Sequence, residues 1–525
     1  MKKLFTSALL VLSALTMQAK DFKTPLNVYY METDFPSDGD VTVSAVEEAD
    51  KSYTFTLKNF MFMGGGVGTI TVHNIQAEKC GIVTALKTQQ TIKIEKGDDP
   101  SVKEWMSDIL PDVPINMYAE IKGDEINGEL SIDMTAGGVG LIRVDLGKNY
   151  SQIGQIPNSN FETFHPAKEG ADYVEPNAWH SFMSATAKTT LISNMLSNLL
   201  EQSKDTRPGS EGKSSVRLFS ADKSITSANG TMTTGRLNAG SSKAKDPSNH
   251  SYLDLSLKDV DNNGDPFYTI MNLKPDAVNV WVKYHRGAKS GYTWDNSKYI
   301  YASARAIITD GEYYQDPEDD KYNNIVAVAE DKTIGDTNDK WKELTIPFSY
   351  TSTKVTPRAI LVTLSTNAQP GGGSRNDNDR DVLFVDDLSL VYNCGIKTLS
   401  VKGNELKDED ADGIYTMDYK GEVNVNDIKV ISDGIGAYIT KSIEETRNGI
   451  EVTINVTSND LKKVNTYTLK VNGATTGIKA PQSVTLPNGV QAIYNLAGQQ
   501  VGSMTPGQVY IVKTTDGQTK KVIKK

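Results

Sequence analysis

Apolar and polar residues alternate along much of the chain with the period of two that a half-buried β-strand produces. In the first part of the chain this alternation recurs at 53–57, 69–72 and 130–134. Two glycine-rich stretches, 64–70 and 137–142, suit the bulges and bends that allow a sheet to close on itself. The pattern predicts a small closed β-barrel over residues 20–148.

One segment of this region has a helical period instead. Ser101 and Glu104 have the spacing of a capping box, and the apolar residues around them fall on one face of a helix. The sequence therefore predicts a helix over 101–110 that plugs the barrel. A barrel of this size holds one small ligand or is filled by side chains, and both alternatives stay open here.

A larger strand-rich region spans residues 150–395. Its alternating segments are 277–285, 299–308, 344–350, 359–366 and 382–392. Antiparallel strands joined by long loops predict a two-sheet sandwich of the jelly-roll type. An amphipathic helix is expected at 188–202, and the Ser-, Gly- and Thr-rich stretch 203–249 is expected to be mostly loop with a few short strands.

The rest of the chain predicts two further β units. Residues 396–473 match the size of an Ig-like sandwich, and residues 474–525 form a compact tail with hairpin signals at 495–498 and 516–517. The fold class is therefore mainly β and multidomain, because 525 residues exceed what a single hydrophobic core supports.

The N-terminus has the layout of a secretory signal peptide. Lys2 and Lys3 precede a mostly apolar stretch from 4 to 17, and Ala19 is a small residue at a plausible cleavage point. No later apolar run approaches the roughly 18 to 20 residues that span a bilayer. We therefore expect residues 1–19 to be removed, and the mature chain to be secreted, extracellular or displayed at the outer-membrane surface, without a transmembrane span.

Charge and cysteine content narrow the function classes. Loss of Lys2 and Lys3 lowers the basic residues from 55 to 53 against 66 acidic ones, so the net charge becomes −13. Such a surface repels phosphate backbones, and nucleic acid is not an expected partner. Cys80 and Cys394 fall in different units and are expected to be separately buried thiols, with a disulfide as the alternative.

Motifs for common catalytic chemistries are missing from the sequence. Its five histidines include no i, i+4 zinc pair, and it has neither a Gly-x-Ser-x-Gly nor a Cys-x-x-Cys motif. A glycosidase, however, needs only two carboxylates at a set distance in space, which a sequence cannot display. Binding without catalysis is therefore the favoured hypothesis, and enzymatic activity stays open.

The large domain has outward-facing aromatic residues of the kind that bind sugars. Alternation in the segments 277–285 and 299–308 directs an aromatic-rich face outward, and the apolar face of a sugar stacks on such rings. If both strands lie in one sheet, these side chains form a platform with a wall from the connecting loop. The alternative is that the rings pack beneath a loop or against another domain. The candidate residues are Trp281, His285, Trp294, Tyr299, Tyr301 and Arg305.

Two parts of the chain resemble families of exported proteins. The tail, through 493–498, 505–513 and its lysine-rich end, resembles the C-terminal sorting domain of the type IX secretion system, which implies secretion machinery as a partner. The first domain is similar to calycin-like barrels over roughly 25–148, through its strand pattern and the Gly-Thr-Ile-Thr-Val element at 68–72.

The large domain resembles the PCMD family, whose name stands for putative carbohydrate metabolism domain. The resemblance covers most of 157–393 and rests on segments 158–162, 177–182, 346–350 and, most of all, 383–390. It implies a carbohydrate as the ligand class and no particular reaction.

Related sugar-binding jelly rolls often hold a structural calcium that joins their first and last strands. Glu162, Asp386 and Asp387 stand at the matching places, and carboxylates suit that cation. A solvated end of the sandwich is the alternative. The acidic loops that begin at Asp259 and Asp408 lack the Glu that an EF-hand requires at position twelve, so hairpin turns are expected there.

Three functional hypotheses follow. The first is a secreted or surface protein whose jelly-roll domain binds a glycan, with capture or metabolism as its role. The second is a glycoside hydrolase-like enzyme on the same domain. The third is an adhesion or structural surface protein whose barrel and Ig-like unit contact other proteins.

Overall fold

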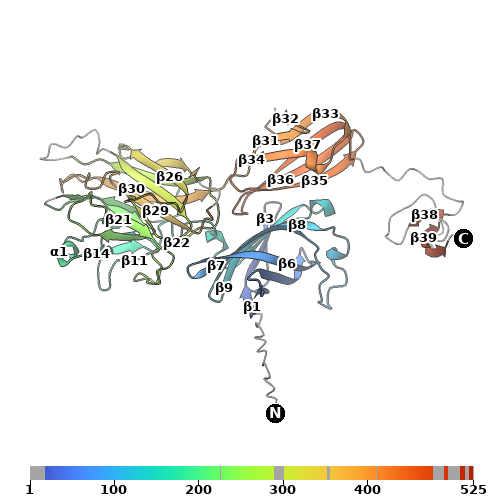
Figure 1. Cartoon of the computed structure of the whole chain (residues 1–525), viewed down its shortest axis with the longest axis horizontal. Helices are drawn as coiled ribbons and strands as arrows, with labels where there is room; N and C mark the ends of the chain where they lie inside the picture. The colour runs from blue at the N-terminus through green and yellow to red at the C-terminus, as the bar shows by residue number, and fades with distance from the viewer. Residues whose placement is uncertain are drawn as a thin grey trace, which may run out of the picture. The chain divides into compact units, whose positions relative to one another are not determined.

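The computed structural model describes residues 18–224, 226–288, 301–351, 355–408, 411–476, 490–494, 509–514 and 519–523. These residues are mainly β, as the alternation predicts (Figure 1). The chain divides into two compact units. The first contains 1–397, 432–440 and 455–465, and the second contains 398–431, 441–454 and 466–525.

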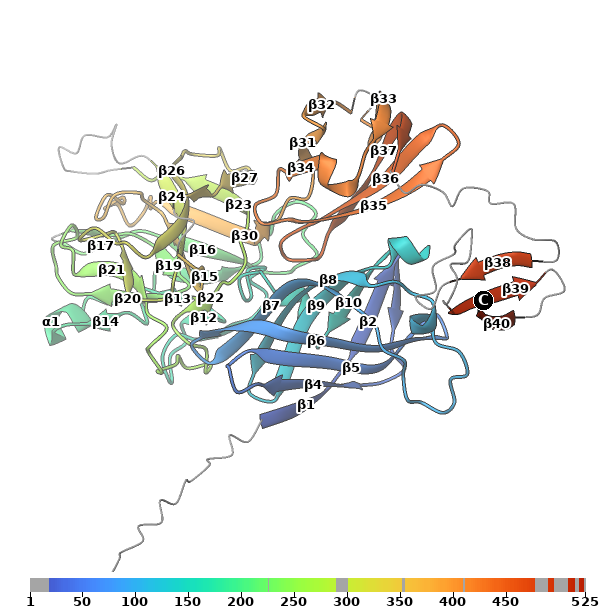
Figure 2. The same ribbon diagram turned by 45° about the vertical axis from the view of Figure 1, so that its right-hand side comes forward.

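Ten antiparallel strands form the first domain, in the order β1-β4-β5-β6-β7-β8-β9-β10-β2-β3 (Figure 2). The strands are β1 (Gln18–Thr24), β2 (Leu26–Tyr30), β3 (Thr33–Pro36), β4 (Val41–Glu47), β5 (Tyr53–Phe62), β6 (Gly65–Cys80), β7 (Val83–Ile92), β8 (Val113–Lys122), β9 (Glu125–Asp133) and β10 (Leu141–Leu146). Their inward side chains make one hydrophobic cluster that includes Phe22, Phe55, Ile70 and Met117. Packed side chains therefore form the core of this domain.

The helix expected at 101–110 does not form. The segment has only a single 3₁₀ turn, Met106–Asp108, and Ile109 is 84% exposed. Trp105 is buried because β6 approaches it at a glycine: a Cβ at Gly66 would lie 2.8 Å from the indole ring. Contact with the barrel wall thus determines this segment more strongly than its helical period does.

The sandwich expected over 150–395 consists of two main antiparallel sheets. The first has the order β13-β19-β29-β24-β26-β28, and the second has the order β15-β16-β30-β23-β27. Their strands are β13 (His180–Ser181), β19 (Thr231–Thr233), β29 (Ala359–Ser365), β24 (Ala302–Thr309), β26 (Ile325–Ile334), β28 (Ser349–Tyr350), β15 (Leu200–Ser203), β16 (Ser215–Phe219), β30 (Val382–Val391), β23 (Ala277–His285) and β27 (Lys342–Pro347). Val280 and Val282 from one sheet and Ala304 and Ala306 from the other share a buried core, as their alternation predicts.

A smaller sheet, β14-β20-β21-β25, accompanies the first main sheet and contributes a wall to the site described below. Its strands are β14 (Thr186–Ala187), β20 (Arg236–Ala239), β21 (Asn249–Leu253) and β25 (Tyr314–Asp316). The helix expected at 188–202 is reduced to α1 (Thr190–Ser193), and the chain turns into β15 by Leu200. Ser193, Asn194, Ser197 and Asn198 favour turns over a helix interior, which explains the early end of α1.

The C-terminal part of the chain is also β-structured. Two sheets, β32-β31-β34 and β33-β37-β36-β35, fill the region expected to be Ig-like. Their strands are β31 (Ile396–Val401), β32 (Asn404–Leu406), β33 (Ile414–Glu422), β34 (Ile428–Ser432), β35 (Tyr438–Thr446), β36 (Gly449–Thr457) and β37 (Val464–Thr475). In the tail, β38 (Val490–Tyr494), β39 (Val509–Thr514) and β40 (Thr519–Ile523) form an antiparallel sheet. The two predicted hairpin turns and residues 1–17 of the signal peptide lie outside the described residues.

Candidate functional site

A row of hydroxyl groups crosses the outward face of the first sheet. Thr231 of β19, Ser365 of β29 and Ser303 of β24 are direct cross-strand partners. The hydroxyl oxygens of Thr231 and Ser365 are 3.0 Å apart. Cross-strand partners of an antiparallel sheet lie side by side on one face, so these three residues form a polar floor.

A second row lies beside the first. Thr233 and Thr363 are cross-strand partners with hydroxyl oxygens 3.3 Å apart, and Thr363 is in turn the partner of Arg305. Arg305 bonds to the Asp316 carboxylate of β25, and its guanidinium nitrogens lie 3.3 Å from Glu318 and 3.0 Å from Glu330. Burial raises the pKa of Asp316, and the Arg305 charge opposes that rise.

An apolar wall faces this floor. It is built on a small hydrophobic cluster in which Ile192 of α1 and Ala239 of β20 are buried. Phe182, Met195 and Leu237 pack on the cluster and are only partly buried. The wall forms because α1 and the small sheet must cover their own apolar side chains, and the first sheet presents hydroxyl groups opposite them.

The loop 241–247 closes one side of the site, and the side chain of Asn249 holds the loop in place. The Asn249 amide donates hydrogen bonds to the carbonyl oxygens of Ser241 and Lys243, at 3.0 and 2.8 Å, and accepts one from the Ser241 N–H, also at 3.0 Å. Asp246 accepts hydrogen bonds from the N–H and hydroxyl of Ser248. One asparagine thus replaces the regular backbone pairing that this loop lacks.

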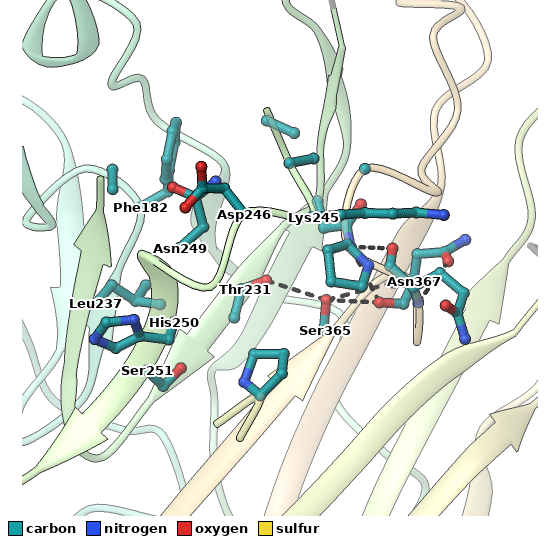
Figure 3. A pocket seen from close by; sticks show the side chains of 18 of the residues that line it. Phe182, Thr231, Leu237, Lys245, Asp246, Asn249, His250, Ser251, Ser365 and Asn367 are labelled. Atoms are coloured by element: carbon teal, nitrogen blue, oxygen red, sulfur yellow. Dashed lines mark hydrogen bonds between the residues drawn. The ribbon is translucent and has the colours of Figure 1, made fainter. Parts of the chain in front are cut away.

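Floor, wall and loop enclose a cavity of about 730 Å³. Figure 3 shows Phe182 and Leu237 on one side of the cavity, and the Thr231–Ser365 hydrogen bond with Asn367 on the other. A cavity of this volume lies within the range typical of small-molecule sites. Its mixture of hydroxyl, amide and apolar side chains can accommodate a ligand with one polar and one apolar side.

The residues predicted for a sugar-binding platform do not share a sheet. Trp281 and His285 lie on β23 of the second sheet, whereas Arg305 lies on β24 of the first, and Tyr301 directly precedes β24. Of the members that the structure describes, only Arg305 lines the cavity. Trp294 and Tyr299 are outside the described residues.

The outward face of the second sheet has aromatic rings that are capped by cations. The Arg207 guanidinium lies 5.4 Å from the Trp281 ring, and the Lys283 ammonium lies 4.5 Å from the Phe384 ring. His285 pairs with Asp379 at 2.8 Å. Arg207 belongs to the loop 204–214, so the Trp281 ring lies against a residue of that loop and does not form a platform with the candidates of the first sheet.

The carboxylates expected to bind calcium hold that same loop. Glu162 accepts hydrogen bonds from the Lys213 and Ser214 N–H groups, and Asp386 accepts one from the Arg207 N–H. Asp387 accepts a hydrogen bond from the Arg207 side chain at 2.6 Å. Oxygens that face N–H donors do not suit a cation, so these residues do not fit a calcium site in this arrangement.

Two buried histidines share one carboxylate elsewhere in the sandwich. The Nε2 atoms of His165 and His180 each lie 3.3 Å from the Asp261 carboxylate. These two contacts hold the loop that follows residue 258 against the segments that carry the histidines. Within the part of the chain that the structure describes, no cluster of three or more His, Cys, Asp or Glu residues is arranged to hold a metal ion. Cys80 and Cys394 are buried free thiols, as expected.

Most residues of the cavity were not identifiable as site residues from the sequence. The region 203–249, expected to be mostly loop with a few short strands, supplies the short strands β19 and β20 and the closing loop. One signal was available: in 231–233 the sequence Thr-Met-Thr alternates hydroxyl and apolar side chains with the period of a strand. That pattern predicts a strand with hydroxyl groups on one face, but it does not predict which strands lie beside it.

No helix in the described ranges is long and apolar enough to cross a membrane. No curated protein matches the chain. The solved structures with remote similarity include the following three. A Bacteroides thetaiotaomicron protein described as a "putative glycoside hydrolase" shares 14% identity, covering 54% of this chain and 87% of its own, with a TM-score of 0.33. A Bacteroides vulgatus protein with the same description shares 16% identity over 44% and 96%, with a TM-score of 0.29.

The third structure, a Bacteroides fragilis protein described as a "putative outer membrane protein", shares 10% identity over 66% and 96%, with a TM-score of 0.17. Scores at this level assign no function to this chain. The family comparison is more specific, because residues 19–144 match the model of the calycin-like β-barrel domain. The first domain of this mainly β, multidomain chain is therefore a calycin-like β-barrel.

Proposed function

We propose that this chain is a secreted or surface-displayed protein that binds a carbohydrate in the cavity of its sandwich domain. The observation that carries the proposal is the pairing of a floor that bears the hydroxyl groups of Thr231, Ser303, Thr363 and Ser365 with an apolar wall across a cavity of about 730 Å³. A sugar has both surfaces: its hydroxyl groups bond to polar side chains, and its C–H faces pack against apolar ones.

Export and the type IX sorting tail complete the proposal. They are supported by the signal-peptide layout at residues 1–19 and by the sequence pattern of residues 490–525. In this proposal the sandwich is a PCMD-like domain that meets its glycan outside the cell, and the tail delivers the protein there.

A cavity-filling substitution tests the binding site. Ser303→Trp places an indole on the polar floor, whereas Thr345→Trp places the same group on an exposed position of the second sheet. Both variants and the unaltered mature chain are screened on a glycan array, and hits are measured by calorimetry. We expect Ser303→Trp to weaken binding about tenfold or more through loss of the contacts in the cavity, and Thr345→Trp to bind normally.

Binding that survives Ser303→Trp in a folded protein would exclude the cavity as the site. If Trp281→Ala then abolished binding, the second sheet would be the site instead. Failure of the mature chain to bind any glycan would contradict the proposal and direct attention to protein partners, as in the adhesion hypothesis.

Hydrolysis in the same cavity is the second candidate function. Asp316 is a buried carboxyl with a raised pKa, and Glu318 lies at the same guanidinium. Glycosidic cleavage uses two carboxyl groups at a set separation, one of them with a raised pKa, and Asp316 and Glu318 supply two carboxyl groups to the lining of the cavity. Product analysis of each bound glycan distinguishes the two functions, and cleavage that disappears in Asp316→Asn and Glu318→Gln would establish the hydrolase.

A further inference from the structure

The outer face of the barrel has a carboxyl group that is completely buried. Glu129 alternates along β9 with Leu130 of the barrel core, so its side chain lies on the opposite, outer face. Its cross-strand partners are Tyr118 of β8 and Asp145 of β10, and the Tyr118 hydroxyl donates to Glu120, at 2.7 Å. Among the residues that the structure describes, Glu129 is 0% exposed and neither of its carboxyl oxygens has a hydrogen-bond donor. Because an ionised carboxylate without donors is costly to bury, this side chain is expected to hold a proton.

The segment 455–465 lies against this face of the barrel, where β8, β9 and β10 are neighbouring strands (Figure 2). The Arg143 guanidinium of β10 donates a hydrogen bond to the Lys462 carbonyl oxygen at 2.8 Å. The Lys462 ammonium donates to the carbonyl oxygens of Ser151 and Ile153, at 2.8 and 2.6 Å. These bonds attach the segment, which joins β36 to β37 in the chain, to the barrel within the first compact unit.

The charges near Glu129 do not replace the missing donors. The Lys462 ammonium lies 3.9 Å from Glu129 Oε1, which is beyond hydrogen-bond distance. Arg143 is bonded to Asp145 at 2.8 Å, and Asp460 adds a second negative charge at this site. With two carboxylates against an ammonium that is bonded elsewhere, these groups do not compensate for the burial of an ionised Glu129. The titratable and charged groups around Glu129 are Tyr118, Glu120, Arg143, Asp145, Tyr150, Asp460 and Lys462.

Ionisation of Glu129 acts against this contact. Burial raises the pKa of Glu129 well above the ordinary carboxyl range, and the Lys462 ammonium opposes that rise. An acid whose pKa is higher in the folded than in the unfolded chain stabilises the fold fully below its unfolded pKa, and this stabilisation is lost as the pH rises through the folded value. Water can solvate the carboxylate only when segment 455–465 moves away, so local opening relieves the cost of ionisation.

From this burial and these contacts we infer that Glu129 is a pH-sensitive latch between the barrel and segment 455–465. The neutral carboxyl group allows the segment to close over the barrel face, and the ionised group at higher pH opens that contact. The barrel core lies on the other side of β9, so the opening is local. This inference does not depend on the proposed carbohydrate function.

Hydrogen exchange of the mature full chain tests the latch. The amides of residues 455–465 are measured by mass spectrometry in the unaltered chain, in Glu129→Gln and in Glu125→Gln, at about pH 5 and about pH 9. Glutamine has the shape of a neutral glutamic acid and does not ionise, and Glu125 is an exposed residue of the same strand. Comparison of the three chains at each pH removes the intrinsic pH dependence of exchange.

We expect the three chains to exchange equally at about pH 5. At about pH 9, residues 455–465 should exchange at least about fivefold faster in the unaltered chain and in Glu125→Gln than in Glu129→Gln. Equal exchange of the three chains at both pH values, or slower exchange in the unaltered chain at the higher pH, would overturn the inference.

Infrared difference spectra between the same two pH values report the protonation state directly. One protonated carboxyl band should be lost from the unaltered chain and from Glu125→Gln as the pH rises, and Glu129→Gln should lack it. Glu129→Leu also removes the ionisable group and takes the place of Glu129→Gln if circular dichroism shows that the latter is not folded. Spectra that are the same in all the chains would show that Glu129 is already ionised at the lower pH, and would also overturn the latch.

Discussion

The three carboxylates of Glu162, Asp386 and Asp387 act as acceptors for one loop. Together they bond to backbone N–H groups of residues 207, 213 and 214 and to the Arg207 side chain. Burial raises the pKa of Asp386 to about 6, and the Arg207 N–H opposes that rise. The loop N–H groups and the Arg207 guanidinium therefore offset part of the negative charge at this end of the sandwich.

Calcium should not stabilise the protein through these carboxylates. An ion that binds only the folded state raises the melting temperature, but here N–H donors already occupy the oxygens. We expect neither calcium addition nor chelation by EDTA to change the melting temperature of the mature chain by more than about 1 °C, as measured by scanning fluorimetry.

Asp386→Ala is the control for this measurement. It leaves the Arg207 N–H without its acceptor and should lower the free energy of unfolding by about 1–3 kcal/mol with or without calcium. A calcium-dependent rise of several degrees in the melting temperature that disappears in Asp386→Ala would contradict this prediction. It would show that the ion displaces the loop 204–214 from the carboxylates.

Alternation along a strand predicts which side of a sheet each residue occupies. Val278, Val280 and Val282 are buried and Trp281 faces outward, as their pattern predicts. The pattern does not predict which strands are neighbours. Trp281 lies opposite Asp386, more than 100 residues away, and Ser303 lies opposite Ser365. The cavity depends on such pairings. Among the candidates that the structure describes, only Arg305 lines it, and the sequence pattern predicts Arg305 for an aromatic platform rather than for this cavity.

Helical periods were misleading at 101–110 and 188–202. Both segments contain apolar residues at helical spacing. In both, apolar side chains take part in other packing or in a strand instead of lining one face of a helix. Trp105 lies against Gly66 and Gly97 of the barrel, and Leu200 begins β15. Tertiary packing overrides a short helix because an isolated helix of this length is marginal in water.

Adjacent glycines of β6 test the packing of the 101–110 segment. A Cβ at Gly66 would lie 2.6 Å from Val102 and 2.8 Å from Trp105, whereas a Cβ at Gly65 would meet only a carbonyl oxygen at 3.5 Å. Gly66→Ala should therefore destabilise the barrel by about 1–3 kcal/mol. Gly65→Ala should be neutral or stabilising by up to about 1 kcal/mol, because alanine restricts the unfolded chain.

Hydrogen exchange measured by mass spectrometry reads the β6 amides separately from the other domains. Faster exchange in Gly66→Ala and unchanged exchange in Gly65→Ala are the expected results. Equal exchange in the two variants would show that Trp105 does not pack tightly on this strand.

At the scale of the whole molecule, the sandwich does not end at residue 395. Tyr438 and Leu461 are buried in its hydrophobic core. The Asp276 carboxylate accepts a hydrogen bond from the Ile435 N–H at 2.8 Å, and the Lys274 N–H donates one to Asn459, also at 2.8 Å. Segments 432–440 and 455–465 therefore belong to the first compact unit.

A chain of residues 20–395 should be less stable than one of residues 20–476. The shorter chain loses the buried Leu461 and Tyr438 side chains and the hydrogen bonds to Asp276 and Lys274. We expect a loss of about 2–5 kcal/mol and a melting temperature several degrees lower by calorimetry. Identical melting of the two chains would mean that the sandwich is complete without these segments.

The floor of the cavity has a consequence for how a ligand is oriented. A hydroxyl group rotates and serves as donor or acceptor, and either oxygen of the Thr231–Ser365 pair can supply the shared hydrogen. When Thr231 donates, Ser365 keeps its hydrogen for the Asn367 carbonyl 3.1 Å away, and when Ser365 donates to Thr231 that bond is given up, so the pair can present two directions of hydrogen bonding to the same ligand. In the proposed carbohydrate site, a floor of this kind would accept a sugar and the same sugar turned end for end, and discrimination between the two orientations would fall to the wall, whose apolar side chains cannot reverse their character.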